Sequence, residues 1–142
     1  MSVDSFLDTN LFIYQLEASD DRKSAIADAI IREGVETGNA CISFQVIQEC
    51  LNTVLRKAEV PLDVSGARAY LDYVLTPLLR VSASAHLYHR GLDIQDRYRY
   101  GFYDSLIIAA ALEAGCTRLL TEDLQDGQRI ETLTIANPFS AG

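Results

Sequence analysis

Short apolar runs alternate along this chain with longer segments in which hydrophobic residues recur at a helical period. In the segment 20–36, for example, Ala25, Ile26, Ala29 and Ile30 fall on one face of a helix with about 3.6 residues per turn. The shorter apolar runs fit buried strands. The pattern therefore predicts helices at 20–36, 44–58, 65–75, 85–98 and 103–114, and strands at 5–7, 41–43, 79–81, 118–121 and 133–135.

Strands that alternate with helices of this length indicate an α/β fold with a mainly parallel, twisted sheet. The chain has 142 residues and carries no internal repeat or linker-like stretch, so we expect one domain over residues 1–142. Helices should flank the sheet on both faces, which makes a three-layer sandwich. In such folds the functional crevice lies at the carboxyl ends of the strands.

Composition narrows the function that this fold can serve. The formal net charge is −8, from 20 acidic and 12 basic residues. Proteins that hold nucleic acid by charge alone are usually basic, so a nucleic-acid enzyme of this charge needs bound cations or a local basic patch. Cys41, Cys50 and Cys116 lie in apolar stretches without C-x-x-C spacing, which predicts small buried side chains in a reducing compartment.

The N-terminal sequence has neither the basic start nor the long apolar segment of a signal peptide. No window approaches the roughly 18 consecutive apolar residues that a membrane span requires. We therefore expect a cytoplasmic protein without a membrane partner.

Four carboxylates occupy the positions at which the crevice is expected. Asp8 follows the first predicted strand, Asp123 follows the strand 118–121, and Glu49 lies on the helix after the second strand. Asp104 opens a helix that is otherwise almost entirely apolar. Each has an ordinary explanation by itself: a helix cap for Asp104, a turn for Asp8, and solvated positions for Glu49 and Asp123.

Together, however, four carboxylates in one crevice repel one another strongly and stay ionised only with a cation between them. Hard oxygen ligands favour Mg²⁺ or Mn²⁺, and the sequence has no His/Cys set with zinc spacing. Such a site suits hydrolysis of a phosphodiester, because the metal shields the phosphate charge and lowers the pKa of a bound water. A metal-bound water, oriented by a carboxylate such as Asp104, would leave 5′-phosphate and 3′-hydroxyl ends.

The stretch 89–100 interleaves arginines with tyrosines shortly before Asp104, and Arg97 and Arg99 are its candidate RNA contacts. The alternative is a solvated helix end with tyrosines packed beneath it. His86 and His89 lie three residues apart and could serve a metal-free acid–base nuclease, although an exposed pair is the simpler interpretation.

The sequence also resembles the PIN domain family and, within it, the VapC-type toxin ribonucleases of toxin–antitoxin systems. Four segments carry the resemblance in order and across nearly the whole chain: residues 6–11 (FLDTNL), 43–49, 102–111 (FYDSLIIAAA) and 120–124 (LTEDL). The resemblance implies a parallel α/β sheet and endoribonuclease activity with Mg²⁺ or Mn²⁺ at Asp8, Glu49, Asp104 and Asp123. It further implies that Asn10, Ser43 and Thr121 support the site by hydrogen bonds.

Glu122 and Asp123 are adjacent, so either could face the metal, and the family pattern favours Asp123. The resemblance also implies a homodimer and a cognate antitoxin that inserts a basic side chain into the acidic pocket. The closing stretch 126–139 is similar to one PIN subgroup rather than to the average toxin. Alternatives are therefore a housekeeping PIN-type nuclease without an antitoxin, a non-catalytic RNA- or protein-binding module, and another phosphohydrolase with an acidic site.

Overall fold

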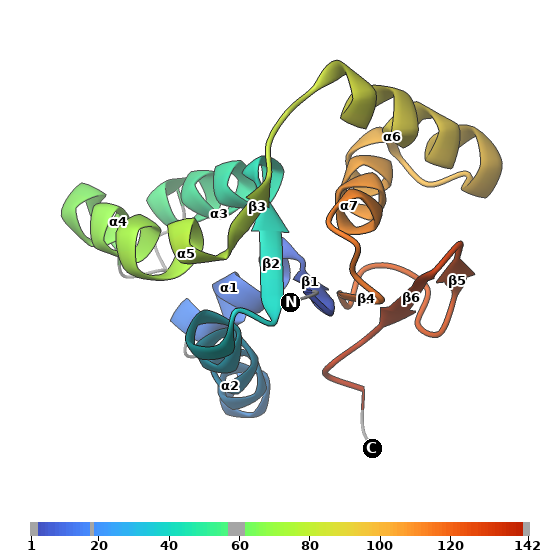
Figure 1. Ribbon diagram of the computed structural model, residues 1–142. Coiled ribbons are helices and arrows are strands. Elements are labelled where there is room, and N and C mark those ends of the chain that lie inside the picture. The colour runs from blue at the N-terminus through green and yellow to red at the C-terminus, as the bar shows by residue number, and fades with distance from the viewer. Residues whose placement is uncertain (1–2, 18, 57–61, 141–142) are drawn as a thin grey trace.

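The computed structural model describes residues 3–17, 19–56 and 62–140. Their centre is a six-stranded sheet in the order β3-β2-β1-β4-β6-β5 (Figure 1). All neighbouring strands run parallel except the pair β5 and β6 at one edge, which is antiparallel. The predicted α/β class with a mainly parallel sheet is thus confirmed. The strands are β1 Ser5–Leu7, β2 Ala40–Ser43, β3 Leu79–Val81, β4 Arg118–Leu120, β5 Arg129–Ile130 and β6 Leu133–Ala136.

The central strands are short and buried on both faces, which explains why they read as continuous apolar runs. In β1, Phe6 and Leu7 are fully buried, and Phe6 stands in register with Cys41 on one side and Leu119 on the other. Because β1 lies between β2 and β4, the residues that follow β1 and β4 emerge next to each other at the same end of the sheet.

Helices cover the sheet on both sides, with α2 packed against β2 from one side and α7 packed against β2 and β4 from the other (Figure 1). Helix α6 in turn packs on α7, and α1 packs on α2 and α3. The helices are α1 Thr9–Leu16, α2 Asp21–Thr37, α3 Phe44–Arg56, α4 Val64–Tyr70, α5 Thr76–Leu78, α6 Ala85–Tyr98 and α7 Phe102–Glu113, with a π-helical segment, η1 Leu71–Leu75, between α4 and α5.

Three features differ from the elements that the sequence predicted. Helix α1 was not expected, because the sequence around Asp8 resembles a turn, yet the Asp8 side chain caps this helix instead. Strand β5 has two residues, too few to give a pattern. The helix expected at 65–75 is interrupted by η1 and continues as α5. The expected end of the helix 44–58 lies outside the described residues.

Two glycines are explained by close packing between elements. A Cβ at Gly34 on α2 would lie 2.7 Å from the Cβ of Ala40 on β2. A Cβ at Gly91 on α6 would lie 2.7 Å from Cδ2 of Leu106 on α7. The glycine that interrupts the composition of α6 therefore allows that helix to approach the apolar helix α7 closely.

The cysteines are buried, as the sequence predicted. Cys41, Cys50 and Cys116 are all buried and free, and the sulfur atoms of Cys41 and Cys116 lie 3.5 Å apart inside the protein. In the parts of the chain that the structure describes, none of the helices has both the length and the apolar character needed to cross a bilayer.

Candidate active site

A cavity of about 520 Å³ opens where the chain leaves β1 and β4. Its described lining contains five acidic residues and no lysine, arginine or histidine. The four carboxylates that the sequence singled out are all present, together with Glu17. The full lining is Asp8, Thr9, Asn10, Ile13, Tyr14, Glu17, Glu49, Asn52, Thr53, Asp104, Ile107 and Asp123.

Asp8 is the most buried of these carboxylates, with 7% of its surface exposed. It is the N-cap of α1, where Oδ1 accepts a hydrogen bond from the backbone N–H of Thr9 at 2.7 Å. The hydroxyl of Thr121 donates to Oδ2 at 2.8 Å. Burial and, to a smaller extent, the nearby charges of Glu49 and Asp123 together raise the pKa of Asp8 to about 6 despite these hydrogen bonds.

Glu49 is held in the cavity by two side chains that the sequence did not single out. The Thr9 hydroxyl donates to Oε1 at 2.7 Å, and the Gln45 amide lies 3.3 Å from Oε2. Gln45 also donates to the backbone carbonyl of Tyr103 at 3.1 Å, which connects α3 to the start of α7. The only signal in the sequence was spacing, since Gln45 precedes Glu49 by one helical turn.

Asp123 and Glu122 point to different surroundings. Asp123 lines the cavity, and its Oδ2 accepts a hydrogen bond from Asn10 Nδ2 at 3.1 Å. Glu122 instead accepts hydrogen bonds from Tyr14 and from Lys23, whose Nζ lies 2.8 Å away. Burial raises the pKa of Glu122, but the hydrogen bonds from Lys23 and Tyr14 outweigh it and leave that pKa below its ordinary value.

Asp104 lies in the first turn of α7, which begins after Gly101 without a side-chain cap. Asp104 is therefore not the N-cap residue. Although its side chain is exposed, partial desolvation of the carboxyl raises its pKa, and the charges of Asp123 and Glu49 act in the same direction. The charges of Glu49 and Asp123 thus contribute to the raised pKa of both Asp8 and Asp104.

The donor set of the cavity fits a hard divalent cation, because it supplies carboxylate oxygens from four separate parts of the chain. Burial and, to a smaller extent, repulsion from neighbouring carboxylates raise the pKa of Asp8 and Asp104. Across the described residues, however, no group of three or more Asp, Glu, His or Cys side chains is arranged so that it could hold a metal ion. The carboxylates therefore share one cavity without forming a ready-made cage.

The three residues that the resemblance assigns to hydrogen-bonding support of the site differ in the hydrogen bonds they make. Asn10 donates to Asp123, and Thr121 donates to Asp8 while accepting from the backbone N–H of Asp123 at 3.1 Å. Ser43 ends β2, and its hydroxyl is buried without a hydrogen-bond partner in the described part of the chain; the same is true of Oδ1 of Asn10. Thr121 is consequently the link between the two aspartates, and Ser43 makes no such link.

The arginines proposed as RNA contacts do not line the acidic cavity. Arg97 is exposed and lines a second cavity of about 310 Å³, together with Arg90, Asp93, Asp96 and Glu131. Arg99 is exposed at the end of α6 in a left-handed conformation (φ 67°). Both arginines lie on the surface, where they could contact a bound strand only outside the acidic cavity.

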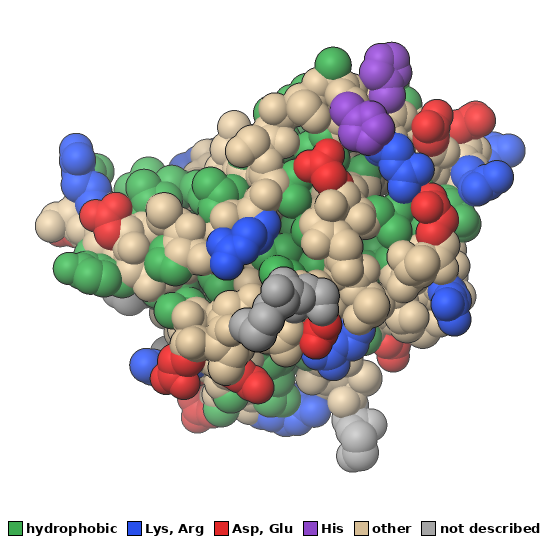
Figure 2. Space-filling view, in the orientation of Figure 1, with side chains coloured by type: hydrophobic (Ala, Val, Ile, Leu, Met, Phe, Trp, Pro, Cys, Tyr) green, Lys and Arg blue, Asp and Glu red, His purple; other side chains and the backbone are tan. Residues whose placement is uncertain are grey.

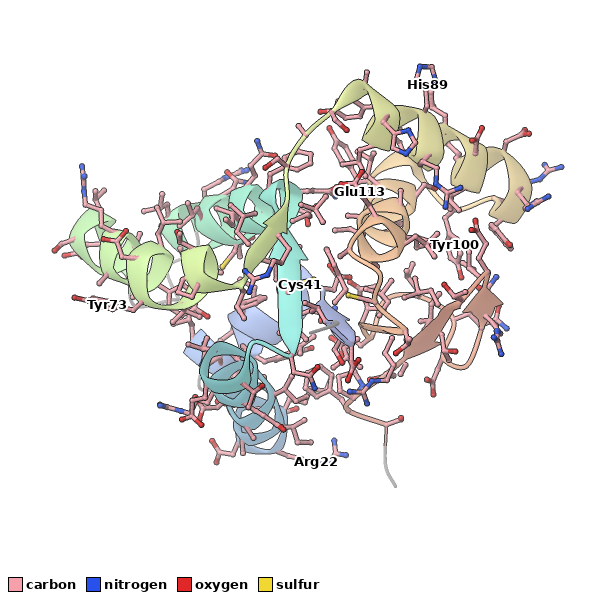
Figure 3. The ribbon with its side chains drawn as sticks, in the orientation of Figure 1. Arg22, Cys41, Tyr73, His89, Tyr100 and Glu113 are labelled. Carbon is pink, nitrogen blue, oxygen red and sulfur yellow. The ribbon has the colours of Figure 1, made fainter. Side chains whose placement is uncertain are left out.

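The two histidines lie on the surface of α6, at the top of the molecule in Figure 2. His89 points outward from this helix in Figure 3, and neither His86 nor His89 lines the acidic cavity. Acid–base chemistry at the acidic cavity therefore has only carboxylates at its disposal among the described titratable side chains, apart from the Tyr14 hydroxyl.

Comparison with protein-family models gives a match to the PIN domain over residues 5–128. The chain belongs to the PIN domain family. The matched range includes all four carboxylates of the cavity. A search of the curated proteins finds no match for this PIN domain.

Solved structures of other PIN-fold proteins show the same architecture. The VapBC2 complex of Rickettsia felis, bound to a DNA fragment of its promoter, aligns with a TM-score of 0.66 at 19% identity, over 94% of this chain and 97% of that chain. A toxin–antitoxin complex from Klebsiella pneumoniae aligns with a TM-score of 0.66 at 16% identity, over 96% and 98% of the two chains. VapC20 of Mycobacterium tuberculosis, described as a toxin that cleaves the sarcin–ricin loop, aligns with a TM-score of 0.60 at 19% identity, over 84% and 92%. At such identities the likeness shows the fold.

Proposed function

We propose that this PIN domain is a metal-dependent endoribonuclease that hydrolyses RNA phosphodiester bonds in the acidic cavity. The observation that carries the proposal is the lining of that cavity: Asp8, Glu49, Asp104 and Asp123 come from four separate parts of the chain and meet without a basic side chain in the described lining. Burial, with smaller contributions from the charges of Glu49 and Asp123, raises the pKa of Asp8 to about 6, and a bound cation would favour its ionised form.

The four carboxylates would hold Mg²⁺ or Mn²⁺, which supplies charge shielding for the phosphodiester and a water of lowered pKa. The protein contributes the orientation of its own oxygens. Thr9 fixes Glu49, and Thr121 fixes Asp8. Both oxygens of each carboxylate accept one hydrogen bond, and each oxygen keeps a second lone pair that a ligand in the cavity could use.

Asp104 is the best-placed proton acceptor among the four. It is exposed at the start of α7, so a water and a phosphodiester can reach it, and its raised pKa brings it closer to the working pH of a general base. In the proposed reaction it accepts a proton from the water that attacks phosphorus in line. The bond between phosphorus and the 3′ oxygen breaks, the leaving 3′ oxygen takes a proton from solvent, and the products carry 5′-phosphate and 3′-hydroxyl ends.

We further infer that the nuclease is the toxin of a type II toxin–antitoxin pair. Complexes of VapBC type recur among the solved structures that share its fold, and another of these structures is described as a toxin that cleaves the sarcin–ricin loop. A cavity with five acidic side chains would accept a basic side chain of an antitoxin, which would compete with the metal for the same oxygens. A homodimer belongs to the same proposal.

Cleavage of a mixed cellular RNA pool tests the chemistry. Wild type is incubated with Mg²⁺ or Mn²⁺, with and without a chelator, beside Asp8→Asn and, as a matched control, Asp93→Asn from the second cavity. The proposal expects discrete fragments with 5′-phosphate ends that require both the metal and Asp8 and survive the change at Asp93. Cleavage that ignores the chelator, or that persists in Asp8→Asn, would overturn it.

A further inference from the structure

Lys23 on α2 belongs to a polar network that reaches the acidic cavity through Tyr14. Its Nζ lies 2.8 Å from Oε2 of Glu122 and 3.3 Å from the hydroxyl of Tyr14, and this hydroxyl donates to Glu122 as well. The ammonium group also lies 4.9 Å from the centre of the Tyr14 ring and 5.5 Å from that of Phe139. Three segments, α1, α2 and the chain after β4, thereby meet around one carboxylate.

This network bears directly on which of two neighbouring acids enters the cavity. Tyr14 lines the cavity, as does Asp123, whereas Glu122 is turned to Lys23. Asp123 is held from its other side by Asn10 and, through its backbone N–H, by Thr121, which also binds Asp8. Fixing Glu122 outside the cavity therefore fixes the backbone from which Asp123 reaches into it.

We propose that Lys23 is a positioning residue that holds Glu122 outside the cavity and so orients Asp123 toward a bound metal. The inference rests on the proposed metal-dependent function. Aromatic contacts connect this network to the segment after β6. Phe139 is buried against Tyr14, with ring centres 5.0 Å apart in an edge-to-face arrangement.

Charge alone predicts the opposite effect of removing Lys23. An ammonium group close to an acidic cavity repels a divalent cation, so its loss should tighten metal binding. Positioning predicts weaker binding, since supporting hydrogen bonds around metal ligands set affinity by about tenfold or more. The sign of the change thus separates the two roles.

The test is titration of the purified full chain with Mn²⁺, with free Mn²⁺ measured by electron paramagnetic resonance. Lys23→Met is expected to raise the Kd about tenfold, the lower end of such supporting effects, and Lys23→Arg to restore it. Arg32→Met is the matched control. Arg32 is on the same helix and pairs with Asp28 at 2.8 Å, but among the described residues it does not contact a cavity-lining side chain as Lys23 contacts Tyr14. Tyr14→Phe, which removes one hydroxyl, provides a milder variant should Lys23→Met fail to fold.

A double-variant cycle shows whether Lys23 acts through Glu122. In a Glu122→Ala background, Lys23→Met is expected to cause no further weakening, since the side chain it holds is gone. Unchanged or tighter Mn²⁺ binding by Lys23→Met and Tyr14→Phe, or the same loss in Arg32→Met, would overturn the positioning role. Absence of Mn²⁺ binding by wild type would instead overturn the proposed metal site, and this inference with it.

Discussion

Two polar cavities of this protein differ in how their charges are balanced. The smaller cavity, beside α6, contains two arginines and three acids, and Arg90 pairs with Glu131 at 3.3 Å. The larger one contains five acids and no base in its described lining. Ion pairs of the first kind are common on protein surfaces and contribute little to stability. Acids gathered without a base repel one another, and such clusters with raised pKa values at Asp8 and Asp104 are typical of functional sites.

The largest expected difference between the cavities is in RNA cleavage. Asp104→Asn should reduce kcat by a factor on the order of a hundred or more, because it removes both a metal ligand and the proton acceptor of the proposed reaction. The same exchange at Asp96, in the smaller cavity where arginines balance the acids (the balanced cavity), should leave kcat unchanged. Single-turnover cleavage of one RNA substrate measures both, and equal losses in the two variants would remove the distinction between the cavities.

The second expected difference concerns stability without metal. Because burial raises the pKa of Asp8 from 3.8 to about 6 in the folded protein, the folded state binds the proton more tightly than the unfolded one. The stability that this tighter proton binding gives the folded protein is fully present below pH 3.8 and is lost as the pH rises through about 6. At pH 7.5 with chelator, Asp8→Asn should therefore be more stable than wild type, by up to about 3 kcal/mol from the size of the shift.

Urea unfolding of both proteins at pH 4.5 and 7.5 checks this sign, because the stability difference should grow with pH. Asp93→Asn in the balanced cavity serves as the control for the general effect of pH. Saturating Mn²⁺ should reverse the order at pH 7.5, since it stabilises only the protein that binds it. A stability difference that shrinks with rising pH would contradict the account of Asp8.

A smaller effect is expected from Arg97 and Arg99, at the C-terminal end of α6. If Arg97 and Arg99 hold the RNA outside the acidic cavity, their joint replacement by Ala should raise KM a few-fold and weaken its dependence on salt by about two charges, with kcat unchanged. RNA cleavage at several salt concentrations measures this. An unaltered KM would assign the arginine–tyrosine stretch to the solvated surface.

The smallest expected effect is on the ion pair of the balanced cavity. Glu131→Gln should change the free energy of unfolding by less than about 1 kcal/mol, because the pair with Arg90 is partly exposed and screened by solvent. Thermal unfolding at low and high salt measures it. A larger loss would mean that the balanced cavity has a structural role beyond this pair.

The gathering of the four carboxylates in one cavity was predictable because Asp8 and Asp123 follow strands, Glu49 lies on the helix after a strand and Asp104 opens an apolar helix. A mainly parallel sheet brings such positions to one edge. The strands β1, β2 and β3 were located from their short apolar runs. Helix α1 was not, because its start at Asp8 combines a cap with a site residue and its pattern spans only eight residues.

The residues that hold the carboxylates in place were harder to identify. Thr9 and Gln45 act through hydrogen bonds across 40 and 58 positions of sequence, to Glu49 and to the Tyr103 carbonyl respectively, and a pattern of local periodicity carries no information about such pairs. The choice between Glu122 and Asp123 depends on Lys23, which is 99 positions away from Glu122. These contacts between residues far apart in the sequence could be identified only from the folded structure.

The most direct test of the central claim is the position of Mn²⁺ in crystals of the protein grown or soaked with that ion, determined from anomalous scattering. The account predicts a peak among the carboxylates of Asp8, Glu49, Asp104 and Asp123, and its loss in Asp8→Asn. A peak elsewhere, with these carboxylates unligated in crystals that bind Mn²⁺, would contradict the assignment of the acidic cavity as the metal site.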